Sequence, residues 1–177
     1  EMNAVVVFES LWGNTAAIAR AIAEGIGDEA RVLSTAEAAS TALAGVELLV
    51  VGSPVLGFRA PTDSMIRSIA TNPAEVHSSP DLSQPAMQSW LAGLAQGTGC
   101  AAAFETRIWW SPGGATGAIE RGLAQAGYRV LAKGQRFIVK DKQQGFDYAN
   151  KMLELGGLGH SAVIHTGDMK IADEYGV

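Results

Sequence analysis

The residues that follow the first apolar run of the chain could bind an anion. Ser10 and Thr15 supply two hydroxyl groups, Gly13 lets a ligand approach the backbone closely, and a helical pattern begins at Asn14. Backbone N–H groups at a helix N-terminus and the helix dipole both favour negative charge. The first lysine or arginine of the chain is Arg20, so hydrogen bonds and the dipole alone would hold the anion. This segment therefore predicts a phosphate-binding loop.

The spacing in this loop differs from two common nucleotide-binding motifs. It contains neither Gly-Lys-Ser/Thr nor Gly-x-Gly-x-x-Gly, which rules out a Walker loop and a dinucleotide fingerprint. Ser10 and Thr15 could instead only cap a helix. Capping alone would require neither Gly13 nor two hydroxyl groups, so phosphate binding is the favoured interpretation.

The elements that must position this loop are predicted by three apolar runs at residues 4–8, 46–51 and 100–104. These runs have almost no polar alternation, which is typical of strands buried on both faces of a parallel sheet. Apolar residues at helical spacing predict an amphipathic helix over residues 14–26. We expect the remaining elements as follows: a weak strand at 31–33, a short helix within 34–44, a proline-rich surface loop at 72–85, helices at about 85–96 and 115–126, and a fifth strand spanning about 128–131 and 137–139.

Composition limits the kind of protein this can be. The 177 residues are 47% hydrophobic and 18% charged, which suits one globular domain. The formal charge of −5 argues against nucleic acid as a partner and is compatible with a positively charged protein. No apolar stretch is long enough for a membrane span, and Cys100 is the only cysteine, so we expect a cytoplasmic protein. The scattered histidines, His77, His160 and His165, suggest no metal or hydrolytic site.

Residues 9–19 closely resemble the FMN-phosphate loop of flavodoxins and flavodoxin-like domains, and the resemblance extends over about residues 3–141. It implies a five-stranded, doubly wound parallel sheet of order 2-1-3-4-5 with helices on both faces. It also implies FMN as the cofactor. The phosphate-binding residues would be Ser10, Leu11, Trp12, Gly13, Asn14 and Thr15.

Two further loops resemble the ring-binding loops of that family by their position after the apolar runs. The implied contacts in the second loop are Ser53, Pro54, Val55, Leu56, Gly57 and Phe58, and those in the third are Glu105, Thr106, Arg107, Trp109 and Trp110. Gly57 is the candidate for the peptide that meets the flavin N5–H, because glycine tolerates a positive φ. Phe58 could stack on the ring or anchor the packing of its loop.

The third loop departs from better-known flavodoxins, which place acidic residues and a tyrosine there. Residues 102–107 instead look like a branch of bacterial flavodoxin-like proteins with a Phe-Asp/Glu-Thr-Arg stretch. If Arg59 or Arg107 lies near the ring, it would stabilise negative charge on the reduced flavin and make the reduction potential less negative. Both arginines could instead form surface ion pairs.

The C-terminal segment differs in character from residues 2–141, which we interpret as the flavodoxin-like domain. Within residues 142–177, a helix is predicted over 146–155 and ended by Gly156 and Gly157, and it can serve as the last helix of a flavodoxin fold. Residues of about 148–177 also resemble a short piece of CoA-acylating aldehyde dehydrogenases, without a catalytic cysteine. This tail could be a fused or borrowed docking segment, or the likeness could be chance.

These observations favour an FMN-binding electron-transfer protein that exchanges electrons with redox partner proteins. An FMN-dependent quinone reductase of the same fold is one alternative. The other is a flavodoxin-like domain that has lost the flavin and serves as an interaction module. The oligomeric state is left open.

Overall fold

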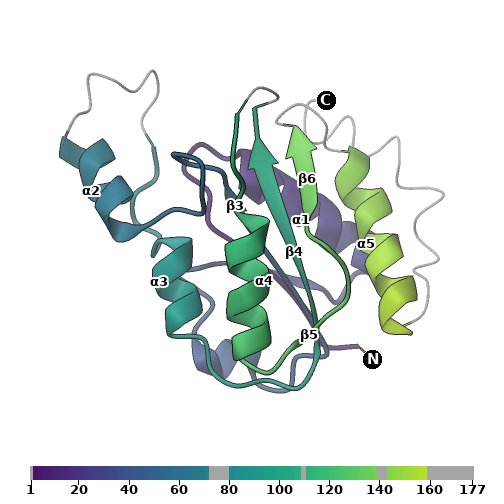
Figure 1. Cartoon of the computed structure of the whole chain (residues 1–177). Helices are drawn as coiled ribbons and strands as arrows, with labels where there is room; N and C mark the ends of the chain where they lie inside the picture. Colours follow the sequence, from purple (N-terminus) through teal and green to yellow (C-terminus); the bar gives the residue numbers. More distant parts are fainter. Residues whose placement is uncertain (1, 72–79, 109–110, 139–142, 159–177) are drawn as a thin grey trace.

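The computed structural model describes residues 2–71, 80–108, 111–138 and 143–158. Strands alternate with helices along most of the chain, as the apolar runs predict (Figure 1). In chain order the elements are β1 (Ala4–Phe8), α1 (Asn14–Ile26), β2 (Arg31–Ser34), the 3-10 helix η1 (Ser40–Leu43), β3 (Leu48–Pro54), α2 (Asp63–Thr71), α3 (Met87–Ala92), β4 (Cys100–Arg107), α4 (Thr116–Gln125), β5 (Arg129–Val130), β6 (Gln135–Ile138) and α5 (Gln143–Gly156).

The sheet is parallel, with the order β2-β1-β3-β4-β5, which confirms the predicted 2-1-3-4-5 arrangement. Two short strands share the fifth position, because β5 pairs with the start of β4 and β6 with its end. Between them the chain leaves the ladder and approaches α4, where the Gly134 N–H donates to the Glu120 carboxylate. A Cβ on Gly134 would overlap the Thr116 side chain, so glycine permits this close passage.

Two apolar cores lie on opposite faces of the sheet, one under α1 and α5 and the other under α3 and α4 (Figure 1). Alternate residues of β1 enter different cores: Val6 belongs to the first, and Val5 and Val7 to the second. Burial on both faces explains the unbroken apolar runs in the sequence. All five residues of β1 are buried.

Helix α5 completes the first core. Ala149, Met152 and Leu153 are buried there beside Ile18 and Ile22 of α1. The helix predicted over residues 146–155 is therefore present and begins three residues earlier, at Gln143. It ends at Gly156, and Gly157 follows with a left-handed φ of 66°. Residues 159–177, and with them most of the stretch that resembles aldehyde dehydrogenases, lie outside the described residues.

Helix α2 and the bounds of α3, β3 and β4 differ from expectation; β3 spans Leu48–Pro54 and not 46–51. Helix α2 was not predicted. None of its residues is fully buried, so it lacks the buried face of a core helix, and it lies away from the sheet (Figure 1). The helix expected at about 85–96 is limited to Met87–Ala92, because the Gly93 N–H donates to the carbonyls of residues 89 and 90 and ends the helix there. Strand β4 extends past residue 104 to Arg107, since the end of β3 continues to pair with it.

Among the described residues, no helix has the length and apolar character needed to cross a bilayer.

Candidate functional site

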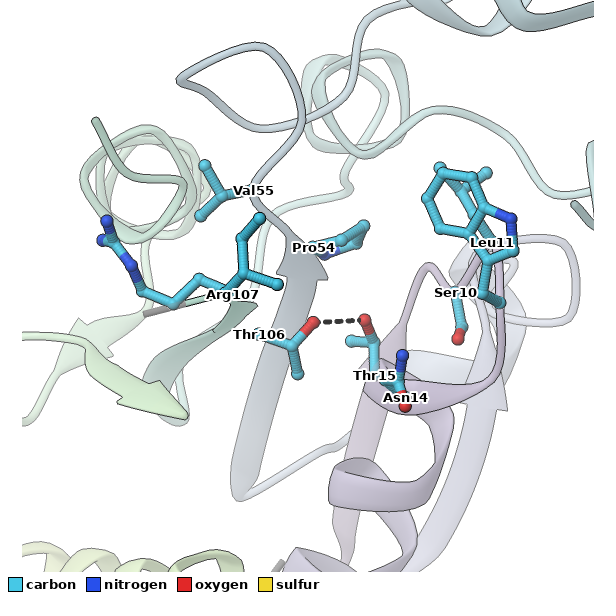
Figure 2. A pocket seen from close by; sticks show the side chains of 10 residues that line it. Ser10, Leu11, Asn14, Thr15, Pro54, Val55, Thr106 and Arg107 are labelled. Carbon is cyan, nitrogen blue, oxygen red and sulfur yellow. Dashed lines mark hydrogen bonds between the residues drawn. The ribbon is translucent and has the colours of Figure 1, made fainter. Parts of the chain in front are cut away.

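A cavity of about 260 Å³ opens at the carboxyl ends of β1, β3 and β4. This is the edge at which ligands bind in doubly wound sheets. All three predicted loops contribute to its wall, and Figure 2 shows their side chains converging on it. The lining residues are Ser10, Leu11, Trp12, Asn14, Thr15, Pro54, Val55, Thr106, Arg107 and Ile108.

The first loop has the backbone geometry of an anion site. Gly13 adopts a left-handed φ of 92°, which lets the chain turn sharply into α1 at Asn14. The Gly13 N–H donates to the Ser10 hydroxyl oxygen at 3.1 Å, so the side chain holds the turn closed. Ser10 and Thr15 are buried, and the N-terminus of α1 points its N–H groups toward this loop. The loop can therefore hold an anion with uncharged donors.

A buried hydrogen bond joins the first loop to the third. The hydroxyl oxygens of Thr15 and Thr106 lie 2.8 Å apart across the floor of the cavity (Figure 2). Either hydroxyl can be the donor, so each can also turn its remaining hydrogen-bonding capacity toward a ligand. This contact fixes the distance between the N-terminus of α1 and the end of β4.

The second loop forms a tight turn beside the cavity. The backbones of Leu56 and Arg59 exchange two hydrogen bonds, of 2.9 and 3.2 Å, around Gly57 and Phe58. Both central residues have a positive φ, 52° at Gly57 and 71° at Phe58, as in a type I′ turn. Phe58 is 64% exposed, so its side chain is not a packing anchor; its carbonyl instead accepts the Gly114 N–H at 3.0 Å.

Glu105 was expected to contact the flavin ring, but its side chain lies elsewhere in the structure. It lies in β4 and is fully buried, and its Oε2 accepts the N–H groups of Ala115 and Thr116 at 2.5 and 3.1 Å. Its Oε1 pairs with Arg107 at 3.1 Å and Arg136 at 3.4 Å. Glu105 therefore anchors the start of α4 and does not line the cavity.

The sequence left open whether Arg107 and Arg59 lie near the flavin ring, and the position of Glu105 determines which groups Arg107 binds. Arg107 lines the cavity, but its guanidinium points away from Ser10 and Thr15 (Figure 2) and binds Glu105 and the Gly113 carbonyl. Arg59 is exposed to solvent. The charge of Arg107 is thus compensated by a buried carboxylate, which weakens the expectation that it tunes a flavin potential.

The predicted residues fall into three groups. Nine of them line the cavity: Ser10, Leu11, Trp12, Asn14, Thr15, Pro54, Val55, Thr106 and Arg107. Gly13 and the stretch 56–58 shape adjacent loops, and Ser53 is buried in β3. Trp109 and Trp110 lie outside the described residues. Ile108, which was not predicted, lines the cavity and is 44% exposed.

Sequence reasoning missed the segment of residues 80–87, which fastens the first loop from outside. The Ser10 N–H donates to the Gln84 side-chain oxygen at 2.9 Å, and the Asp81 N–H donates to the Leu11 carbonyl at 2.8 Å. The Met87 N–H donates to Oε1 of Glu9 at 2.8 Å. Nothing in the sequence of this segment indicates these contacts, because their partners are at least seventy residues away.

Glu9 is the unusual member of this set. Its carboxylate is fully buried, and Oε2 has no hydrogen-bond partner among the described residues. Burial raises the pKa of Glu9 from 4.5 to about 7, while the Met87 N–H lowers it and the negative charge of Asp63 raises it by smaller amounts. Glu9 can therefore gain or lose a proton near neutral pH.

This parallel sheet order, with helices on both faces, is that of the flavodoxin-like fold, and the chain has that fold. No protein-family model matches the chain, and a search of curated proteins gave no match.

Solved structures identify particular proteins that share this fold. A flavodoxin from the domain Archaea is 20% identical with a TM-score of 0.58, covering 99% of this chain and 100% of its own. Flavodoxin 2 from Bacillus cereus is 15% identical with a TM-score of 0.60, covering 86% of this chain and 98% of its own. Rubredoxin oxygen:oxidoreductase from Desulfovibrio gigas is 14% identical with a TM-score of 0.57; the match covers 89% of this chain but only 36% of that one.

Proposed function

We propose that this protein binds FMN at the carboxyl edge of its sheet and serves as an electron-transfer protein. The observation that carries the proposal is the single cavity wall formed by the Ser10–Thr15 loop, Pro54 and Val55, and Thr106. These are the loops that the resemblance to flavodoxins assigns to the phosphate and the ring.

The residues around the cavity suit the two chemically different parts of FMN. Ser10, Asn14 and Thr15 offer uncharged polar groups at a helix N-terminus, a combination that favours a phosphate. Leu11, Pro54, Val55 and Ile108 offer apolar surface that would exclude water from one side of a flat ring.

The flavin would supply the redox chemistry, and the protein would supply binding, orientation and electrostatics. The cavity volume of about 260 Å³ lies just below the range for small-molecule sites, about 300–1,000 Å³, so part of the ring would reach the surface. Trp12, 42% exposed, and Ile108 are the apolar side chains at that rim.

We propose redox partner proteins as the electron donors and acceptors, with contact at the rim that contains Trp12 and Ile108. The cytoplasm is the proposed location, because the only cysteine, Cys100, is a buried thiol that suits a reducing compartment.

An absorption and fluorescence titration with FMN and with riboflavin tests the proposal. We expect saturable binding of FMN that is at least tenfold tighter than binding of riboflavin, because riboflavin lacks the phosphate. Ser10→Ala should weaken FMN binding by at least about tenfold and leave riboflavin binding unchanged, since one hydrogen bond to a charged group is worth about 1.5–3 kcal/mol.

Ser64→Ala is the matched control, because Ser64 is an exposed serine at the start of α2 that does not line the cavity. Equal effects of both substitutions, or no binding of either flavin, would contradict the proposal; the second result would favour the interaction-module alternative. Rapid NAD(P)H oxidation with a quinone by the FMN-loaded protein would favour the quinone reductase.

A further inference from the structure

Two buried carboxylates lie in one row across the sheet. Strand pairing aligns Phe8, Gly52 and Phe104, so the next residues, Glu9, Ser53 and Glu105, fall on the same face. On that face each carboxylate accepts N–H groups from the start of a helix. Glu9 reaches Met87 of α3, and Glu105 reaches Ala115 and Thr116 at the start of α4.

The two carboxylates differ in how their charge is compensated. Glu105 is bonded through both oxygens and pairs with Arg107 and Arg136. Glu9 accepts one N–H, and no lysine, arginine or histidine of the described chain forms an ion pair with it. An ionised carboxylate with so little compensation is costly to bury, whereas a neutral carboxylic acid can keep its bond to the Met87 N–H.

Glu9 also borders the loop that is proposed to bind phosphate. It directly precedes Ser10, and the 80–87 segment binds Glu9, Ser10 and Leu11 in succession through Met87, Gln84 and Asp81. Because Glu9 is the residue next to Ser10, a phosphate dianion bound by the Ser10–Thr15 loop would add a second negative charge one residue along the chain from Glu9. Like charges favour the protonated form of a carboxyl group.

We propose that Glu9 is a positioning residue that takes up a proton, on Oε2, when the phosphate of FMN binds to the Ser10–Thr15 loop. The proposal rests on the proposed function. The proton comes from solvent, and the neutral carboxylic acid holds the loop on the 80–87 segment without opposing the charge of the phosphate. Because Glu9 has a pKa of about 7 in the flavin-free protein, this proton uptake occurs in the physiological pH range.

Other charged groups around Glu9 do not account for such an effect. Asp63, at the start of α2, adds negative charge and accepts the Ser89 hydroxyl at 2.7 Å. Asp81, in the 80–87 segment, has its pKa lowered by hydrogen bonds from Ser83 and Gln84, so it stays ionised. On the neighbouring strands, Ser53 does not titrate, and Glu105 is paired with two arginines.

The test compares FMN and riboflavin dissociation constants at pH 6.5 and 8.5 for the wild type, Glu9→Gln and Asp63→Asn. If bound phosphate raises the pKa of Glu9 by about one unit, the wild-type to Glu9→Gln ratio of FMN dissociation constants rises about sixfold between these pH values. Titration of the phosphate itself cancels in this ratio. The ratio for riboflavin stays constant. Asp63→Asn retains the pH-dependent rise because Glu9 is present, with the midpoint moved to lower pH because Asp63 no longer raises the pKa of Glu9.

A second measurement uses the unmodified protein, so that it remains decisive if Glu9→Gln fails to fold. Calorimetry at pH 7.5 in two buffers of different ionisation enthalpy should show uptake of about half a proton per FMN and none per riboflavin. FMN binding without proton uptake and with a constant ratio would overturn the inference and leave the proposed function intact. Absence of FMN binding at every pH would overturn both.

Discussion

At the scale of single residues, burial and compensation decide how each acidic side chain behaves. Glu105 and Glu9 have the same chemistry and are equally buried, yet the first forms ion pairs and the second has a pKa raised to about 7. The difference comes from Arg107 and Arg136, which contact one carboxylate and not the other. A buried carboxylate without a cation becomes a proton-binding group.

Glu9 should therefore make the stability of the flavin-free protein depend on pH. Its folded pKa of about 7 exceeds the ordinary 4.5, so its favourable contribution is present below pH 4.5 and is lost as pH rises through 7. We expect Glu9→Gln to gain about 2–3 kcal/mol relative to the wild type between pH 5 and pH 8. Urea unfolding at both pH values measures this, and an unchanged difference between the two proteins would show that Glu9 does not titrate in the folded state.

At the scale of elements, the second and third loops support each other through their backbones. Gly113 has a φ of 75°, and a Cβ at this position would overlap the Phe58 carbonyl oxygen. That carbonyl accepts the Gly114 N–H, which holds the turn of residues 56–59 against the start of α4. The left-handed Phe58 is retained because this contact fixes its backbone.

Gly113→Ala should consequently destabilise the protein by about 2–3 kcal/mol, through both the unfavourable φ and the overlap. Gly93→Ala is a suitable comparison, because Gly93 has a negative φ and its added Cβ would make only ordinary contacts. Thermal and denaturant unfolding of both variants measure the difference. Equal stability would mean that the two loops move apart without cost.

At the scale of the whole molecule, the described part of the C-terminal segment belongs to the domain core. Helix α5 begins after residue 141, where the sequence suggested a domain boundary, yet Met152 and Leu153 are buried against α1. The role of residues 159–177 stays a prediction.

Two leucines in the same helix test this arrangement. Leu153 is fully buried, and Leu153→Ala should cost about 2–5 kcal/mol of unfolding free energy because it leaves a cavity. Leu155 is 47% exposed, and Leu155→Ala should change stability by less than about 0.5 kcal/mol. A loss below about 1 kcal/mol for Leu153→Ala would show that α5 is not part of the cooperative core.

The sequence by itself determined the sheet and the loop after its first strand. Residues 4–8, 46–51 and 100–104 are apolar on both faces, and that pattern is sufficient for a buried parallel sheet. Ser10, Gly13 and Thr15 mark the loop because hydroxyls, a left-handed turn and a helix start are local requirements. Features of this kind depend on neighbouring residues in the chain, so they can be predicted without knowledge of distant contacts.

Only the tertiary structure decided which polar side chains line the cavity and which are used for support. Thr106 meets Thr15 from ninety-one residues away, while Glu105, its neighbour in β4, faces the start of α4. The 80–87 segment and the raised pKa of Glu9 likewise depend on partners far along the chain. Burial and partner atoms fix the state of a polar group, and neither is set until the chain has folded.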